Sequence, residues 1–367
     1  MIIIFISIIS VILALVHIVI YKAVVSIFSL SLFWRTITGV LLAVFCLSFI
    51  LASILVSNFN NLFTRIYYTI SAIWLGVAFY LFLASCVYVL MIFILRIFGV
   101  NTSLEWFGIL CIALALIISI YGVVHARNIV IKNVNVVLPN LPISWQGKKA
   151  VYISDVHLGA IYGEDFSESI VEKINKINPD IVFIGGDLYD GVKVNETEVV
   201  KPFTDLHPAL GTYFVTGNHE EFRDVTHYLE VVKNTGVIVL NDQMVTIDGL
   251  QLVGVDDRDS TNPAKFQAIL AGLNINKNEP SILLKHQPLQ LDEAAQAGIS
   301  LQISGHTHKA QVFPLNIFTH MMFKGYDYGL KMYKDMAVYT SSGVGTWGPP
   351  LRVGSDSEIV VFTFSTK

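Results

Sequence analysis

The chain has 367 residues, of which 54% are hydrophobic and only 14% are charged, and its formal net charge is −4. That composition is too apolar for an average soluble protein, and the apolar excess lies in one part of the chain. Residues 1–125 contain four basic and one acidic side chain, which leaves 20 of the 24 basic and 27 of the 28 acidic side chains for residues 126–367. The acidic balance of this second part argues against a broad nucleic-acid-binding surface.

The amino-terminal third is predicted to be a transmembrane helical region. Four of its uncharged apolar runs are each near or above the roughly 20 residues that a helix needs to cross a hydrocarbon core. These runs are Ile2–Tyr21, Ile37–Val56, Ile66–Leu95 and Trp106–Val124. The first run lacks the basic start and the small-residue cleavage site of a signal peptide, so we expect it to be retained. Residues 1–125 are therefore expected to be membrane-embedded, and residues 126–367 to form a soluble domain.

The basic residues near the ends of these runs are divided evenly between the two faces of the membrane, so they do not indicate the orientation. His17 is the only ionisable residue well inside a predicted span, which favours an anchor over a transport pathway. All three cysteines (Cys46, Cys86 and Cys111) lie in the apolar part. The soluble domain therefore has neither a disulfide nor a thiolate metal site.

In the soluble domain, short apolar strands alternate with helices, and polar clusters follow the strands. Five such clusters contain Asp155 and His157, Asp187 and Asp190, Asn218 and His219, His286, and His306 and His308. In open α/β sheets the carboxyl ends of the strands are where ligands bind. On extended backbone, residues two apart share a side, so Asp155 and His157 are expected to face one point. A carboxylate beside an imidazole is a ligand pair for a divalent transition metal.

The order of these blocks (D-x-H, G-D-x-x-D, G-N-H-E, H and G-H-x-H, within residues 150–308) resembles the calcineurin-like metallophosphoesterases. The following stretch, with Gly343 and Arg352, is similar to the membrane-associated branch of that family, which includes YkuE-type and transmembrane metallophosphoesterases. The resemblance implies an α/β sandwich of two central sheets flanked by helices. It also implies that residues 126–367 form a catalytic domain with a dinuclear metal centre at the strand ends.

The motif match implies seven metal ligands. Asp155, His157 and His308 would bind the first metal, Asn218, His286 and His306 the second, and Asp187 would bridge both. Histidine, carboxylate and amide ligands without a thiolate suit two divalent ions of Mn, Fe or Zn.

The resemblance also implies a reaction, in which a hydroxide held by the metals attacks phosphorus in line with the leaving oxygen. His219 would protonate the leaving group and Asp190 would orient His219. An imidazole with a pKa near neutrality suits such an acid, and a carboxylate partner fixes its tautomer. Glu220 is expected to be structural, and Arg352 is a candidate substrate contact.

Two features bear on the substrate. Lys309 and Ala310 stand where relatives in the membrane branch often have Gly-Gly, so the rim of the substrate site is expected to differ. The run Val312–Lys324 is unusually apolar, and it is either a buried strand pair or an apolar lip that meets lipid. The leading hypothesis is a phosphoesterase acting on a phosphate ester or pyrophosphate of a phospholipid or lipid-linked compound. A soluble nucleotide, a cyclic nucleotide or a phosphoprotein is the alternative substrate, and a non-catalytic metal-binding sensor domain is a third hypothesis.

The expected location is a multi-pass protein of a bacterial cell membrane. Its expected partners are the lipid bilayer and the phosphoester substrate, without nucleic acid. Relatives of this family are often exported, which favours an extracytoplasmic catalytic domain, although the charges leave both orientations open. The oligomeric state cannot be read from the sequence.

Overall fold

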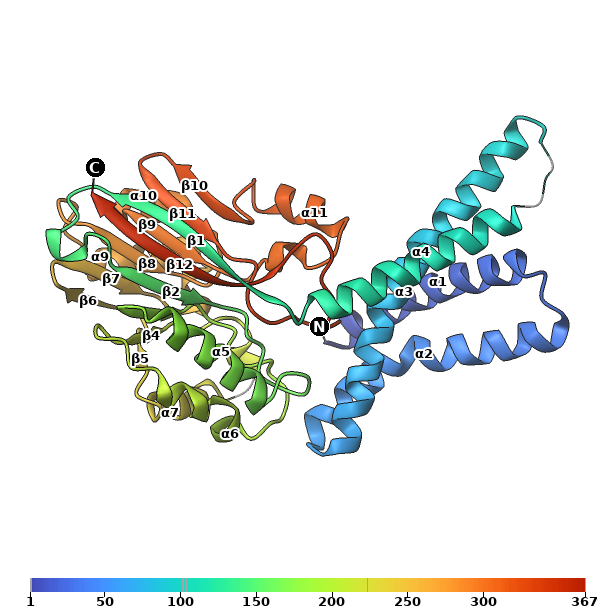
Figure 1. The fold of residues 1–367 in the computed structure, drawn as a ribbon, viewed down its shortest axis with the longest axis horizontal. Coiled ribbons are helices and arrows are strands. Elements are labelled where there is room, and N and C mark those ends of the chain that lie inside the picture. Colours follow the sequence, from blue (N-terminus) through green and yellow to red (C-terminus); the bar gives the residue numbers. More distant parts are fainter. Residues whose placement is uncertain (1, 101, 103, 223, 367) are drawn as a thin grey trace. The chain divides into compact units, whose positions relative to one another are not determined.

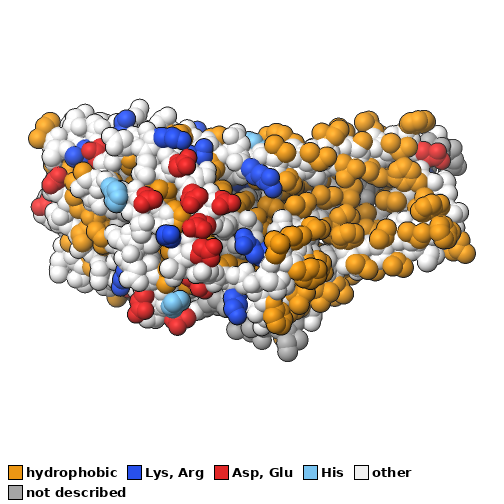
Figure 2. All heavy atoms as spheres, turned by 60° about the horizontal axis from the view of Figure 1, so that its bottom comes forward, with side chains coloured by type: hydrophobic (Ala, Val, Ile, Leu, Met, Phe, Trp, Pro, Cys, Tyr) orange, Lys and Arg blue, Asp and Glu red, His pale blue; other side chains and the backbone are white. Residues whose placement is uncertain are grey.

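The computed structural model describes residues 2–100, 102, 104–222 and 224–366, and the chain divides into two compact units (Figure 1). One unit is Met1–His125 with Gly348–Leu351, and the other is Ala126–Trp347 with Arg352–Lys367. Hydrophobic side chains gather over the helical unit, whereas most of the Lys, Arg, Asp and Glu side chains lie over the other unit (Figure 2). The uneven composition of the sequence therefore reflects two units with different surfaces.

Among its described residues the helical unit contains four helices that are long and apolar enough to cross a membrane, which confirms the predicted number of long apolar helices. They are α1 (Ile2–Ile27), α2 (Leu32–Asn58), α3 (Leu62–Ile97) and α4 (Glu105–His125). Each helix extends beyond its predicted apolar run, because the hydropathy of the sequence marks only the apolar middle of a spanning helix.

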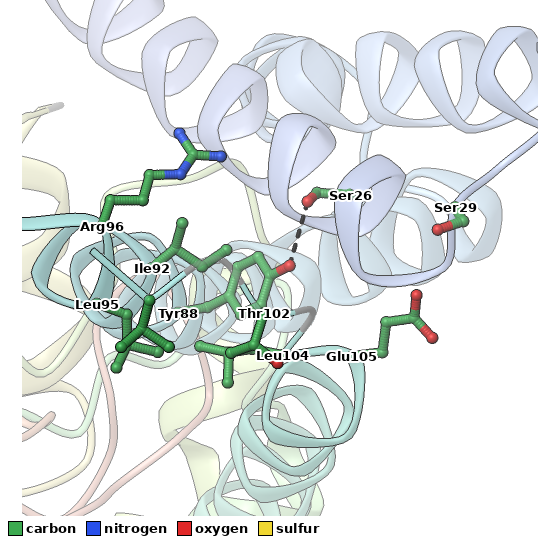
Figure 3. A pocket seen from close by; sticks show the side chains of 10 residues that line it. Ser26, Ser29, Tyr88, Ile92, Leu95, Arg96, Thr102, Leu104 and Glu105 are labelled. Carbon is green, nitrogen blue, oxygen red and sulfur yellow. Dashed lines mark hydrogen bonds between the residues drawn. The ribbon is translucent and has the colours of Figure 1, made fainter. Parts of the chain in front are cut away.

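His17 is a packed residue between α1 and α3. Its Nε2 accepts a hydrogen bond from the indole N–H of Trp74 (3.1 Å), and its Nδ1 bonds the Leu13 carbonyl oxygen (2.8 Å). Elsewhere in this unit a cavity of about 290 Å³ lies among α1, α3 and α4 (Figure 3). The hydroxyl groups of Ser26 and Tyr88 form a hydrogen bond (3.1 Å) at its wall.

The second unit contains two six-stranded mixed sheets. The first sheet has the order β1 (Ile129–Leu138), β12 (Ser357–Thr366), β2 (Lys149–Ile153), β3 (Ile181–Ile184), β4 (Thr212–Phe214) and β5 (Ile238–Val239). The second has the order β10 (Gly329–Tyr333), β11 (Met336–Thr340), β9 (Leu301–Ser304), β8 (Ser281–Leu284), β7 (Leu250–Gly254) and β6 (Gln243–Ile247).

Helices and short 3-10 turns connect these strands. The helices are α5 (Glu164–Ile177), α6 (Glu196–Val200), α7 (Val225–Lys233), α8 (Asp257–Ser260), α9 (Pro263–Gly272), α10 (Leu291–Ala297) and α11 (Leu315–Met322). The 3-10 turns cover Ile143–Trp145, Lys201–Asp205, Glu220–Phe222 and His308–Ala310.

The core of this unit has three apolar layers. Tyr152 and Phe183 of the first sheet pack with Ile303 and Tyr339 of the second, in a cluster of fully buried side chains. On the outer faces, α5 and α7 cover the first sheet, and α9 and α10 cover the second. This arrangement confirms the predicted sandwich of two sheets flanked by helices.

The two sheets bring together the chain segments that carry the predicted site. In the first sheet β2, β3 and β4 are parallel neighbours, and in the second β8 and β9 are parallel neighbours. Each of these five strands ends immediately before one of the five polar clusters. Parallel register therefore places the clusters of each sheet along one edge.

The apolar run Val312–Lys324 is not a buried strand pair, so that expectation is wrong. Eight of its residues form α11, and none of these eight is buried. Phe318, Met321 and Met322 expose 65%, 72% and 71% of their surface. The polar residues Asn316, Thr319 and His320 are spaced three and four apart, which is the period of a helix and the signal in the sequence that indicates α11.

Candidate metal centre

Asp155 and His157 lie in a turn rather than on extended backbone, so the stated reason for their convergence is wrong. Strand β2 ends at Ile153, and both residues have φ +53°, in the left-handed region. The Asp155 N–H donates to the carbonyl oxygen of Gly186 (3.0 Å), and the His157 N–H donates to that of Asp187 (3.1 Å). The turn after β2 is therefore hydrogen-bonded along the loop after β3. These backbone bonds hold the predicted ligands of the two loops close together.

Three more predicted ligands have left-handed backbone: Asp187 (φ +51°), His306 (φ +69°) and His308 (φ +48°). For residues other than glycine, this conformation costs of order 1–3 kcal/mol each and persists only where the surroundings enforce it. Such strain collects at functional sites, and here it coincides with the polar clusters at the strand ends.

The ligand atoms converge into two neighbouring groups. One contains Asp155, His157 and His308, the other contains Asp187, His286 and His306, and within each group the atoms lie within 4.8 Å of one another. His308 Nε2 is 3.4 Å from Asp155 Oδ1, and 3.1 Å from His157 Nε2.

Asp187 lies between the two groups. Its Oδ2 is 3.2 Å from His286 Nε2 and 3.9 Å from His157 Nε2, so one carboxylate reaches both groups. The motifs group these residues in the same way, and ligation itself stays a prediction.

One buried atom shows that the site fits metal ions. Among the described residues, Asn218 Oδ1 is buried and lacks a hydrogen-bond partner. Leaving a buried polar atom unpaired costs about 1–3 kcal/mol, so this oxygen needs a hydrogen-bond donor or a cation for its lone pair. His286 Nδ1 bonds the carbonyl oxygen of Gly185 (2.8 Å), which in the neutral ring leaves the lone pair on Nε2.

Electrostatics keep His306, His308 and Asp187 in the protonation state that metal binding needs. At His286 burial favours the neutral ring, but the nearby carboxylates, Asp187 first, raise its pKa well above the usual value, so a metal would displace a proton there. Burial, followed by the positive charge of His286, lowers the pKa of His306 to about 3. Burial and then the charge of His157 hold the pKa of His308 well below its usual value. For Asp187 burial favours the neutral acid. The charge and the hydrogen bond of His286, with the charges of His219 and His157, together outweigh burial and hold the pKa well below the usual range. Neutral imidazoles and an ionised carboxylate are the ligand forms for divalent ions.

Two glycines allow the loops to approach this closely. A Cβ on Gly217 would lie 2.3 Å from Asp187 Oδ1, and a Cβ on Gly305 would lie 2.3 Å from Asp155 Oδ2. Only a hydrogen atom fits at either position, so each polar cluster requires its glycine.

Asp190 contacts His219 through its main chain more closely than through its carboxylate. His219 Nδ1 is 3.0 Å from the Asp190 carbonyl oxygen and 4.0 Å from Oδ1. The Asp190 carboxylate lies closer to His157 Nδ1, at 3.5 Å. The carbonyl fixes the tautomer of His219, with the proton on Nδ1. The catalytic roles of both residues stay predictions.

Glu220 has a more specific position than the sequence indicated. Its carboxylate is fully buried and accepts three backbone N–H bonds, from Gly217 (2.6 Å), Asp187 (2.9 Å) and Tyr189 (3.1 Å). Burial, followed by the charge of Asp187, raises the pKa of Glu220 to about 7. This side chain joins the loops after β3 and β4. The only signal in the sequence was an acid directly after His219.

Trp347 lies next to the site but belongs to none of the five motifs. Its indole is 58% exposed and stands edge-on to the His219 ring, with the ring centroids 6.0 Å apart. It is an exposed aromatic ring next to the predicted acid.

Arg352 has protein partners in the structure. Its guanidinium is fully buried and donates to the carbonyl oxygens of Ser342 (2.6 Å) and Gly345 (2.6 Å) and, more weakly, of His308 (3.3 Å). Burial lowers its pKa to about 10. These contacts brace the loop that carries His308, and the predicted contact with substrate stays a prediction.

Comparison with known proteins gives consistent matches. The family model "calcineurin-like phosphoesterase" matches residues 148–310. A transmembrane protein with a metallophosphoesterase domain from Danio rerio is 33% identical over 266 residues, which cover 68% of this chain and 61% of that protein. An uncharacterised metallophosphoesterase of Aquifex aeolicus is 32% identical over 225 residues, covering 60% of this chain and 85% of the relative. The metallophosphoesterase YkuE of Bacillus subtilis is 27% identical over 237 residues, covering 62% and 82%. The chain spans about three fifths of the length of the Danio rerio protein, and of similar relatives from Campylobacter jejuni and Bos taurus.

Proposed function

The chain belongs to the calcineurin-like metallophosphoesterases, and from this membership we propose that it is a membrane-anchored hydrolase of a phosphoester or pyrophosphate bond. The observation that carries the proposal is the convergence of two groups of ligand atoms, each within 4.8 Å, at the ends of five strands. Four helices long and apolar enough to span a membrane support the anchoring.

In this proposal seven side chains hold two divalent ions of Mn, Fe or Zn. Asp155, His157 and His308 hold one ion, Asn218, His286 and His306 hold the other, and Asp187 is shared. When bound, the ions neutralise charge on the phosphoryl oxygens and lower the pKa of a water molecule.

The chain's own residues then handle the proton of the leaving group. The Asp190 carbonyl accepts the Nδ1–H of His219, so the doubly protonated ring would give its second proton, on Nε2, to the leaving oxygen. Glu220 acts through others, because its bonds to the Asp187 and Gly217 N–H groups fix both loops. Arg352 supports the His308 loop by donating to the His308 carbonyl oxygen.

We propose an amphiphilic substrate, a phospholipid or another lipid-linked phosphate. The second unit is joined directly to the predicted spanning helices, since only Ala126–Asn128 separate α4 from β1 along the chain. The exposed apolar side chains of α11 give the second unit a surface suited to alkyl chains. Faster hydrolysis of soluble nucleotides or phosphoproteins than of amphiphilic phosphates would replace this substrate class by a soluble one.

The test is hydrolysis of bis-p-nitrophenyl phosphate by the purified full chain in detergent, with Mn²⁺ and with a chelator. Asp187→Asn is expected to lower kcat by at least about 100-fold, because it weakens a ligand placed between both groups. Asp248→Asn is the matched control, since Asp248 is exposed and has a similar backbone (φ +48°). Turnover that persists in chelator, or in Asp187→Asn, would contradict the proposal.

A further inference from the structure

A left-handed turn directly follows the last histidine motif. Four consecutive residues other than glycine have positive φ: His308 (+48°), Lys309 (+50°), Ala310 (+59°) and Gln311 (+63°). Each such residue costs about 1–2 kcal/mol, a penalty that glycine escapes. Predicted ligation accounts for the conformation of His308. It does not explain why a long cationic side chain occupies the next position.

The Lys309 side chain lines a cavity of about 360 Å³ beside α11. Its ammonium lies 4.5 Å from the centroid of the Tyr328 ring, in a cation–π contact. Lys331 lines the same cavity and donates to the Gly325 carbonyl. Ile317 and Met321 of α11 form an apolar part of the wall.

The charge of the cavity wall is positive. Its one carboxylate, Asp327, is buried and paired with His320, whose Nδ1 is 2.8 Å from Oδ1. Among the described residues that line the cavity, the only acid is therefore already paired with His320, and neither lysine is paired with it. An anion with an apolar neighbour is the ligand that this combination suits.

The cavity adjoins the metal centre. Lys309 directly follows the predicted ligand His308, and Thr307 Oγ1 donates to the Asp327 carbonyl (2.7 Å), which ties the motif to the cavity wall. At the end of α11, the Phe323 ring stands edge-on to the His306 ring with centroids 6.1 Å apart. The cavity wall therefore begins at Lys309, the residue next to the last predicted ligand.

We propose that Lys309, with Lys331, forms a subsite for a second anionic group of an amphiphilic substrate, whose alkyl chain lies along Ile317 and Met321. This inference rests on the proposed function and deepens it. A lipid pyrophosphate has the required chemistry, because its second phosphoryl group carries a charge next to the one that is attacked. The strain at Lys309 is then the cost of placing an ammonium in this cavity wall.

The test compares three substrates of the full chain in mixed micelles with Mn²⁺. CDP-dioleoylglycerol has two charged phosphoryl groups and alkyl chains, dodecyl p-nitrophenyl phosphate has one charge and a chain, and bis-p-nitrophenyl phosphate has one charge and no chain. Lys309→Met is expected to raise KM for the first at least about tenfold more than for the other two. Met321→Ser is expected to raise KM for both substrates with chains.

Lys334→Met is the matched control. Lys334 also has left-handed backbone (φ +55°), but it is exposed, does not line the cavity and pairs with Asp292 (2.5 Å). All three KM values are expected to match those of the wild type. If Lys309→Met fails to fold, Lys331→Met is the second variant. It is also expected to raise KM for CDP-dioleoylglycerol more than for the other two substrates.

The outcomes separate this inference from the proposed function. Equal changes of KM for all three substrates in Lys309→Met would overturn the subsite and leave Lys309 as a support of His308. Wild-type turnover of bis-p-nitrophenyl phosphate without cleavage of CDP-dioleoylglycerol would also overturn it, with the proposed function intact. Absence of turnover on every substrate would refute the proposed function itself.

Discussion

Replacing Gly217 by alanine is expected to disable the centre while the two sheets stay folded. The added Cβ would lie 2.3 Å from Asp187 Oδ1 and 2.5 Å from Asp187 N, where ordinary van der Waals contact begins at 3.4 Å. The loops after β3 and β4 must therefore separate by roughly 1 Å. The buried Glu220 carboxylate bonds both loops and opposes that movement.

The expected magnitude follows from this overlap. Overpacking of this kind costs about 1–3 kcal/mol of the free energy of unfolding. A displacement of about 1 Å at a catalytic centre lowers the rate on the order of 100-fold. Thermal unfolding and metal-dependent hydrolysis of bis-p-nitrophenyl phosphate, both on the purified full chain, measure the two effects.

Gly272→Ala is the matched control. A Cβ on Gly272, in α9, meets nothing within 4 Å and the residue does not have left-handed backbone, so alanine is expected to keep full turnover and a Tm at or slightly above that of the wild type. If Gly217→Ala retained more than about half of the wild-type turnover, the close approach of the two loops would not be a requirement of the site.

Three further predictions follow from the geometry. His219→Ala is expected to lower kcat by about 10²–10⁴-fold, whereas Asp190→Asn is expected to lower it less, because the main-chain carbonyl of Asp190 contacts the ring (3.0 Å); equal losses would show that the carboxylate is the essential partner. Chelation is expected to lower Tm. Metal added at 100 times its Kd is expected to restore about 2.7 kcal/mol per site of the free energy of unfolding, which calorimetry measures. A Tm that does not change with metal would contradict a metal site formed by these residues. Lys309→Gly is expected to raise the free energy of unfolding by about 0.5–1 kcal/mol in denaturant titrations, since glycine removes the strain at φ +50°; a lower stability would mean that packing of the Lys309 side chain outweighs the strain.

The fold and the polar clusters could be predicted because both depend on local sequence. Strand, cluster and helix repeat along the chain, and parallel strands carry their carboxyl ends to one edge. The four long apolar helices were evident from the length and apolarity of their runs. Their ends were not, because helices continue through the interfacial residues that hydropathy scores poorly.

The details of the site depend on contacts between segments far apart in the sequence. The turn at Asp155 and His157 follows backbone bonds to Gly186 and Asp187, which no local pattern encodes. The position of Glu220 depends in the same way on N–H groups from two separate loops. In α11 the spacing of Asn316, Thr319 and His320 indicates a helix, but only tertiary structure shows that its apolar side chains stay exposed.

The most direct test of the dinuclear centre is the metal content of the purified full chain by inductively coupled plasma mass spectrometry. We predict about two divalent ions per wild-type chain, and a clear loss of bound metal in Asp187→Asn, in which the ligand shared by both groups is weakened. Asp248→Asn is expected to keep both ions. A wild-type chain that binds no divalent metal after incubation with Mn²⁺, Fe²⁺ or Zn²⁺, or a metal content unchanged by mutations of both Asp187 and His286, would contradict the account.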